Sequence, residues 1–207
     1  MIKGIDVSKW NNVYNFAAVK KSGYSFVIIR AGGNNGGFYK DPKFEKYYKE
    51  AKEAGLYVGA YYDTGRDFIS QPVGYAAAEH FKTLLKDKQF EMPVFADVET
   101  VATIYKEETT KCVTAFCRSL EKAGYFAGIY ASDISGFKDR LNLQKLQGVF
   151  TLWVARYGTT KPTYVKDVAM WQHSARGIVK GVLGFVDLDK CYVNYPSIIK
   201  KKHLNNF

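Results

Sequence analysis

Two carboxylic acids, Asp97 and Glu99, stand two residues apart at the end of a short apolar run that begins at Met92. The run is typical of a strand buried on both faces. Side chains two apart on a strand point the same way, about 7 Å from Cα to Cα, so both carboxyl groups would project together. Repulsion between two carboxylates can raise the proton affinity of one of them, which suits a general acid. The alternative is a helix cap and a surface acid, since D-x-E is a common tripeptide.

Eight strand-like segments surround this pair, and their spacing changes along the chain. They cover residues 2–7, 26–29, 56–62, 92–97, 125–130, 151–155, 168–172 and 185–188. Helical patterns follow the first five, and one of these helices is predicted to start at Asp41-Pro42, an N-cap followed by proline. The last three strands start only about 17 residues apart, too close for a full βαβ crossover. Five βα units followed by three strands indicate a modified, closed α/β barrel, TIM-like in type.

Polar residues gather at the expected carboxyl ends of these strands, where barrel proteins carry their sites. Each has an ordinary alternative: Arg30 in an ion pair, Tyr62 and Tyr130 in packing, Gln172 as a backbone cap. Trp153 is expected in the barrel wall or core, or stacked on a sugar ring. Gathered at one end, the set predicts acid–base chemistry by carboxylates. Its members are Asp6, Arg30, Tyr62, Asp63, Asp97, Glu99, Tyr130, Arg156 and Gln172, with Asp187 inside the last strand.

The composition favours one domain and an anionic partner. With 207 residues, 47% of them hydrophobic, the chain can bury one sizeable core, and residues 1–207 are predicted to form a single catalytic domain with a short basic tail from about residue 197. The charge of +10, from 30 basic and 20 acidic residues, suits nucleic acid, a membrane surface or an anionic wall polymer. No RNP, KH or helix-turn-helix pattern is present, so a nucleic-acid partner is not expected.

Cofactors and membrane insertion are not expected. Three widely spaced cysteines argue against a disulfide framework, and three scattered histidines form no metal-binding motif. No apolar run of about 18 residues could span a bilayer, and the first residues lack the apolar region of a secretory signal. We therefore expect synthesis in the cytoplasm without a signal peptide, and the sequence leaves the oligomeric state open.

Six short segments, in the correct order, resemble the family 25 glycoside hydrolases, the Chalaropsis-type lysozymes (N-acetylmuramidases). The resemblance covers essentially the whole chain. Its segments are G-I-D-V-S-K-W (4–10), V-G-A-Y-Y (58–62), F-A-D-V-E (95–99), L-W-V-A-R-Y (152–157), M-W-Q-H-S (170–174) and G-F-V-D-L-D (184–189). The last motif usually ends in asparagine in this family, where this chain has Asp189.

The resemblance implies a (β/α)5(β)3 barrel that cleaves the β-1,4 bond between N-acetylmuramic acid and N-acetylglucosamine in bacterial peptidoglycan. It assigns Asp6, Asp97, Glu99 and Asp187 as the catalytic acids, with Glu99 as general acid. It also implies action on the cell wall after release, as in a phage endolysin. From the residues we expect Tyr62, Arg30, Tyr130, Trp153, Gln172 and Asp63 to bind substrate.

Two other functions fit parts of the sequence. A non-catalytic module that binds wall glycans would keep the aromatic residues and the positive charge, but it would need no set of four acids. A chitinase-like hydrolase also uses D-x-E at a strand end. Its longer D-x-x-D-x-D-x-E motif is absent, because Pro93 and Val94 stand where acids would be expected.

Overall fold

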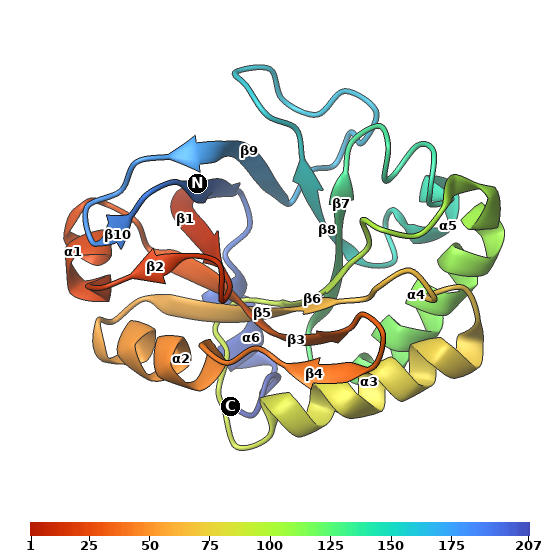
Figure 1. Cartoon of the computed structure of the whole chain (residues 1–207), viewed down its shortest axis with the longest axis horizontal. Helices are drawn as coiled ribbons and strands as arrows, with labels where there is room; N and C mark the ends of the chain where they lie inside the picture. The colour runs from red at the N-terminus through yellow and green to blue at the C-terminus, as the bar shows by residue number, and fades with distance from the viewer.

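Eight strands form the wall of a closed barrel in the computed structural model, which describes all residues from Met1 to Phe207 (Figure 1). Around the barrel the order is β1, β3, β5, β6, β7, β8, β9 and β11, and the pairing of β11 with β1 closes the ring. The expected (β/α)5(β)3 barrel is therefore confirmed. The strands are β1 (Ile2–Val7), β3 (Phe26–Asn34), β5 (Tyr57–Asp63), β6 (Val94–Asp97), β7 (Ala127–Ser132), β8 (Thr151–Ala155), β9 (Met170–Gly177) and β11 (Val186–Cys191).

The last strand runs against both of its neighbours. β11 is antiparallel to β1 and to β9, whereas the pairs from β1 through β9 are parallel. The start of β11 therefore lies beside the end of β1, and Asp187 stands directly opposite Asp6. This reversal brings an acid from the beginning of a strand to the mouth where the other strands end.

Helices cover the outside of the first five strands, and their ends follow local sequence signals. Asn15 caps α1 and Ser70 caps α3, where proline occupies the first turn. The predicted start of α2 at Asp41 lies before the observed one: the helix begins at Phe44, and Asp41 accepts the Lys43 N–H with Oδ1 at 2.9 Å while Oδ2 pairs with the guanidinium of Arg30. The helices are α1 (Phe16–Lys21), α2 (Phe44–Glu53), α3 (Gln71–Leu85), α4 (Lys106–Lys122), α5 (Leu143–Leu146) and α6 (Tyr195–Lys201), with a 3-10 turn over Thr103–Tyr105.

Strand alternation divides the apolar side chains into two layers. Along β3, Phe26 and Ile28 point into the barrel, whereas Val27 and Ile29 pack outward against the helices. Gly4 leaves room for the Phe26 ring, because a Cβ there would lie 2.3 Å from the ring. The barrel interior is therefore filled with side chains.

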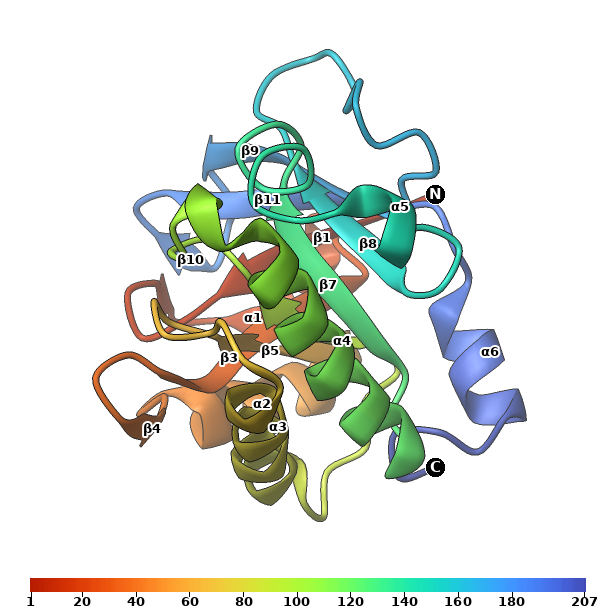
Figure 2. The same ribbon diagram turned by 90° about the vertical axis from the view of Figure 1, so that its right-hand side faces the viewer.

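Two short ribbons extend the mouth, and the other end of the barrel is plugged. β4 (Phe38–Lys40) forms a hairpin with β3, and β2 (Asn12–Val13) pairs with β10 (Val182–Leu183). Figure 2 shows these ribbons at one end of the barrel and α6 with the C-terminus at the other.

The segment expected to be a basic tail from about residue 197 is folded onto the closed end of the barrel. It contains α6, and the side chain of Asn205 is buried, donating to the carbonyl oxygens of Phe90 and Met92 at 3.0 Å each. The lysine run 200–202 remains exposed on this packed segment. None of the helices is both long and apolar enough to cross a membrane.

Candidate active site

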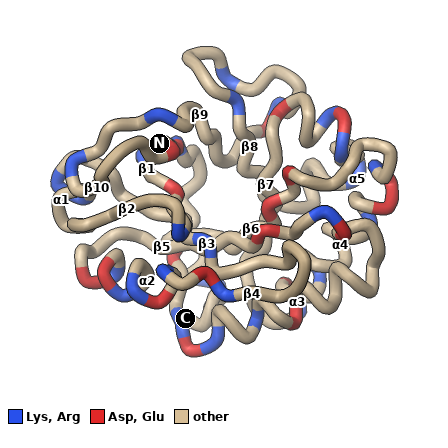
Figure 3. Tube along the Cα trace, in the orientation of Figure 1, with Lys and Arg blue, Asp and Glu red and all other residues tan.

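Four carboxylic acids converge on one small cavity at the barrel mouth. Asp6 ends β1, Asp97 ends β6, Glu99 follows β6, and Asp187 opens β11. All four line a cavity of about 150 Å³, and acidic segments mark the inner rim in Figure 3. Its other lining residues are Tyr61, Tyr130, Trp153, Tyr157 and Gln172. The structure thus brings together the acids that the sequence had spread over almost the whole chain.

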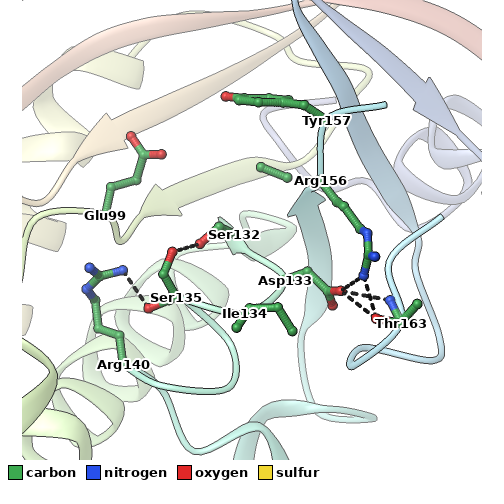
Figure 4. A pocket seen from close by; sticks show the side chains of 10 residues that line it. Glu99, Ser132, Asp133, Ile134, Ser135, Arg140, Arg156, Tyr157 and Thr163 are labelled. Atoms are coloured by element: carbon green, nitrogen blue, oxygen red, sulfur yellow. Dashed lines mark hydrogen bonds and ion pairs between the residues drawn. The ribbon is translucent and has the colours of Figure 1, made fainter. Parts of the chain in front are cut away.

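A larger cavity of about 570 Å³ adjoins the first, and Glu99 lines both. Figure 4 shows Glu99 at one side of this second cavity, above Arg140 and across from Tyr157. Arg140 is anchored by its Nε and Nη1 groups, which donate to the carbonyl oxygens of Val101 (2.5 Å) and Ser135 (3.0 Å). Glu99 therefore stands at the junction between an acidic cavity and a larger polar one.

On the far side of the larger cavity, Asp133 joins the segment after β7 to the loop after β8. Asp133 is buried and accepts hydrogen bonds from the backbone N–H groups of Thr163, Tyr164 and Val165. Arg156 adds an ion pair to the same carboxylate at 3.0 Å. These donors hold the pKa of Asp133 below its ordinary value, the backbone bonds acting against the effect of burial. The loop after β8 is thereby fixed to the segment after β7.

Asp97 and Glu99 both have raised proton affinities. Burial raises the pKa of Asp97 well above its ordinary value, and the charges of Glu99 and Asp63 add to the effect, against the opposing charges of Arg30 and Arg140. Its Oδ1 atom is buried without a hydrogen-bond partner. Burial against the cavity walls also raises the pKa of Glu99, and the charge of Asp63 adds to this, whereas hydrogen bonding to Tyr130 and the charge of Arg140 act in the opposite direction; the residue is nevertheless open to solvent on one side. The site therefore favours a protonated Glu99, and it leaves Asp97 Oδ1 as a hydrogen-bond acceptor without a donor.

The two acids on the opposite wall are shifted in the same direction. Burial and the charge of Glu99 raise the pKa of Asp187 to about 6. Burial raises the pKa of Asp6 well above its ordinary value, with Asp189 and Asp187 adding repulsion. No lysine, arginine or histidine forms an ion pair with any of these acids. Negative charge is concentrated at the mouth without a paired cation.

A chain of hydrogen bonds joins Glu99 to Asp6 across the mouth. The Tyr130 hydroxyl lies 3.2 Å from Glu99 Oε1 and 2.8 Å from Gln172 Oε1. Gln172 Nε2 donates to Asp6 Oδ2 at 2.8 Å, and the Tyr157 hydroxyl lies 3.2 Å from Gln172 Oε1. Tyr130 and Gln172, both predicted at the site, are thus buried links between opposite walls.

Arg30 and Asp63 lie beside the site and line neither cavity. The Nε of Arg30 donates to Asp41 Oδ2 at 2.8 Å, and its charge lowers the proton affinity of Asp97. The hydroxyl of Tyr39 donates to Asp63 Oδ2 at 2.8 Å. Arg30 and Asp63 therefore act on Asp97 in opposite directions, since the charge of Arg30 lowers its pKa and that of Asp63 raises it, and their contact with substrate stays a prediction.

Tyr62, one of the residues predicted to bind substrate, lies away from the site. Tyr62 is fully buried on the outer face of β5, where its hydroxyl bonds His80 Nδ1 at 2.9 Å and its ring packs on Phe81 and Phe116. Tyr61, on the inner face, lines the small cavity instead. Strand alternation decides this, and Tyr61 shares the face of Asp63 two residues on.

Trp153 forms the floor of the small cavity. It is 1% exposed, and its Nε1 donates to Asp189 Oδ1 at 2.8 Å. Its ring centroid lies 4.4 Å from that of Tyr130. Such a buried ring leaves no open face for a sugar, so of its predicted roles the barrel core is the one found.

Tyr61, Tyr157 and Arg140 are among the cavity-lining residues that the sequence did not predict. Tyr61 could have been found from the alternation of β5. Tyr157 stands two residues beyond the end of β8, within the motif 152–157. Arg140 lies in an irregular segment after β7, and no pattern in the sequence points to it. The structure places no three His, Cys, Asp or Glu side chains so that they could hold a metal ion.

Comparisons with known proteins agree on one family. The model for "Glycosyl hydrolases family 25" matches residues 5–182. The autolytic lysozyme of Clostridium acetobutylicum is 31% identical over 190 residues, which are 91% of this chain and 55% of that protein. Lysozyme M1 of Streptomyces globisporus is 30% identical over 91% of this chain and 67% of its own length. The chain thus spans about half the length of the first relative and about two thirds of the second.

Solved structures show the same fold. The crystal structure of the CTP1L endolysin superposes with a TM-score of 0.81 at 26% identity, covering 97% of this chain and 70% of the endolysin. The bacterial lysozyme from Streptomyces coelicolor gives a TM-score of 0.72 at 28% identity, covering 99% of this chain and 97% of that enzyme.

Proposed function

This chain belongs to the glycosyl hydrolases of family 25, and from that membership we propose that it is a peptidoglycan hydrolase (lysozyme) acting on bacterial cell walls. The bond cleaved is the β-1,4 linkage from N-acetylmuramic acid to N-acetylglucosamine. One observation carries the proposal: Glu99 lies between a small cavity lined by four acids and a larger polar cavity. A glycosidic bond that crosses this junction would present its oxygen to Glu99.

Glu99 is the general acid in this proposal. It gives its proton to the glycosidic oxygen as the bond to the anomeric carbon breaks, so the sugar in the larger cavity leaves as an alcohol. The raised pKa of Glu99 supports this role, because the acid must still hold its proton when the substrate arrives. The resulting carboxylate can later take a proton from the incoming water.

Asp97 acts on the 2-acetamido group of the sugar in the small cavity. Its buried Oδ1 has no partner in the free protein, and an acetamido N–H can supply one. Held in this way, the acetamido oxygen attacks the anomeric carbon and forms a ring that water opens from the opposite side. The two displacements retain the anomeric configuration, and no carboxylate nucleophile is required.

Asp6 and Asp187 stand across the mouth from Glu99 and provide the alternative route. Either could activate a water molecule for direct attack, which would invert the configuration. In the retaining route they bind sugar hydroxyls and stabilise positive charge on the ring in the transition state. The pKa of about 6 for Asp187 leaves it mostly ionised at neutral pH, which suits both tasks.

The experiment is digestion of purified peptidoglycan with identification of the new reducing ends. We expect muramic acid at these ends with the wild-type protein and none with Glu99→Gln. N-acetylglucosamine at the new ends would refute the proposed bond. Binding to walls without any new ends would show a non-catalytic wall-binding module, and equal cleavage of chitin would favour a chitinase-like hydrolase.

A further inference from the structure

Asp6, one of the four acids of the site, has another buried acid as its neighbour, Asp189, which lines neither cavity. Asp189 is opposite Gly4 of β1 on one side and Gln172 of β9 on the other. It is 1% exposed, and Asp6 is 6% exposed. Trp153 Nε1 donates to one oxygen of Asp189, while the other, Oδ2, is buried without a partner. A buried carboxylate oxygen without a donor needs an explanation.

A proton on one of the two acids supplies the missing donor. Asp6 and Asp189 are diagonal neighbours across the β1–β11 ladder, where Gly4 is opposite Asp189 and Asp187 is opposite Asp6, and the charge of Asp189 raises the pKa of Asp6. The titratable groups that face the pair are acids, phenols and one thiol, and no cation is paired with it. They are Asp187 and Cys191 on β11, Tyr61 on β5, Tyr130 on β7 and Tyr157 after β8. Two buried negative charges side by side without a cation are strongly unfavourable, so one of them holds a proton.

The single remaining charge decides how Gln172 is oriented. Asp6 Oδ2 accepts from the amide Nε2 at 2.8 Å, so the amide oxygen faces away from Asp6. The reverse orientation would place two acceptors together. The Gln172 oxygen therefore accepts from Tyr130 at 2.8 Å and from Tyr157 at 3.2 Å.

The hydroxyl of Tyr130 has one hydrogen, and two acceptors lie within reach. Gln172 Oε1 is the nearer, at 2.8 Å against 3.2 Å for Glu99 Oε1. Once that hydrogen points to Gln172, Tyr130 can only accept from Glu99. A bond between Glu99 and Tyr130 then requires Glu99 to carry a proton, which is the form that a general acid needs.

We propose that Asp189 and Asp6 share one proton, and that the charge left on the pair directs the hydrogen bonds of Gln172 and Tyr130 so that Glu99 keeps its own proton. Asp189, Gln172 and Tyr130 are positioning residues in this scheme, because they act through Glu99. The inference rests on the proposed role of Glu99, but its first test measures protonation and requires no turnover.

The first test is a carbon-13 NMR titration of the Glu99 carboxyl, assigned by its absence in Glu99→Gln. Tyr130→Phe removes the acceptor of the Glu99 proton, so the titration midpoint should fall by about one pH unit. Gln172→Met frees the Tyr130 hydrogen to stabilise ionised Glu99, and the midpoint should fall again. A rise in Tyr130→Phe, or no change in Gln172→Met, would show that Tyr130 already donates to Glu99 and would overturn the scheme.

The second test concerns the shared proton. A pair whose pKa is raised on folding contributes stability that is complete below the unfolded value and is lost as the pH rises. Asp189→Asn can donate its own N–H to Asp6 and removes the need for the proton. Between pH 5 and 7 the folding equilibrium constant of the wild type should fall about tenfold more per pH unit than that of Asp189→Asn.

The matched control is Asp67→Asn, which changes an exposed aspartate and should follow the wild type. Equal slopes in Asp189→Asn and the wild type would refute the shared proton. If Glu99→Gln cleaved walls normally, the proposed function would fail whatever the NMR showed. If Glu99→Gln were inactive and the midpoint rose in Tyr130→Phe, only the present inference would fail.

Discussion

Replacing Glu99 by glutamine separates proton donation from every other feature of the site. The amide has nearly the same shape and can still bond the Tyr130 hydroxyl 3.2 Å away, but it has no acidic proton for the glycosidic oxygen. General acid catalysis contributes about 10²- to 10⁴-fold, so we expect a rate loss of at least about 100-fold, or roughly 2.7 kcal/mol in the barrier. Because the side chain is partly open to solvent, the fold should not change.

The assay is the release of reducing ends from purified peptidoglycan, with circular dichroism as the check on folding. Glu108→Gln, on the exposed face of α4, is the matched control and should keep wild-type activity. An aryl glycoside whose leaving oxygen needs no proton should restore much of the lost rate to Glu99→Gln. An equal loss on both substrates would refute proton donation as the role of Glu99, and full activity on walls would refute any catalytic role.

Three further predictions follow from the same geometry. Asp97→Asn should lose at least about 100-fold in kcat. It should also melt at a higher temperature, because burial disfavours the ionised carboxylate, as the raised pKa shows, and the neutral amide removes that cost; a lower melting temperature would contradict this. Tyr62→Phe should keep its activity and lose about 1 kcal/mol of stability, because the hydrogen bond to His80 is removed. Tyr61→Phe, in the lining of the small cavity, should lose about tenfold in kcat/KM. The reverse pattern would show that Tyr62 acts in the site. Binding to purified walls should weaken clearly between low and high salt. The +10 charge attracts anionic polymers, and salt screens this attraction, with a screening length of about 8 Å at physiological ionic strength. Salt-independent binding would indicate specific pockets.

Strand spacing and strand ends carried most of the fold prediction. The shorter spacing between strands after the fifth predicted three strands without full helical crossovers, and β8, β9 and β11 confirm this prediction. The direction of β11 was not predicted, because an apolar run has no sign that distinguishes a parallel from an antiparallel strand. It is nevertheless this reversal that sets Asp187 beside Asp6.

The site was predicted best where side chains lie on regular strands. Asp6, Asp97 and Tyr130 follow from the ends of β1, β6 and β7. Tyr62 failed because adjacent positions at a strand end point to opposite faces, and the register of β5 places Tyr61 inward. Arg140 could not be predicted, because it lies in an irregular loop after β7, and no periodic pattern in the sequence indicates that this loop places it near Glu99.

The buried pairs were beyond the reach of sequence reasoning for a different reason. Asp41 has the local features of a helix cap and accepts the Lys43 N–H, but its second oxygen is the buried partner of Arg30. Asp189 has the features of a second acid in a strand, yet it contacts Trp153 and is a buried neighbour of Asp6. Both roles depend on which strands become neighbours after the barrel closes, and spacing along one chain does not contain that information.

NMR of the first product formed, before the sugar ring can equilibrate, distinguishes the retaining route from the inverting one. If Glu99 protonates the leaving oxygen and Asp97 orients the acetamido group for attack, the anomeric configuration is retained and the initial product is the β-anomer. An initial α-anomer would contradict this account and would make Asp6 or Asp187 the base that activates water.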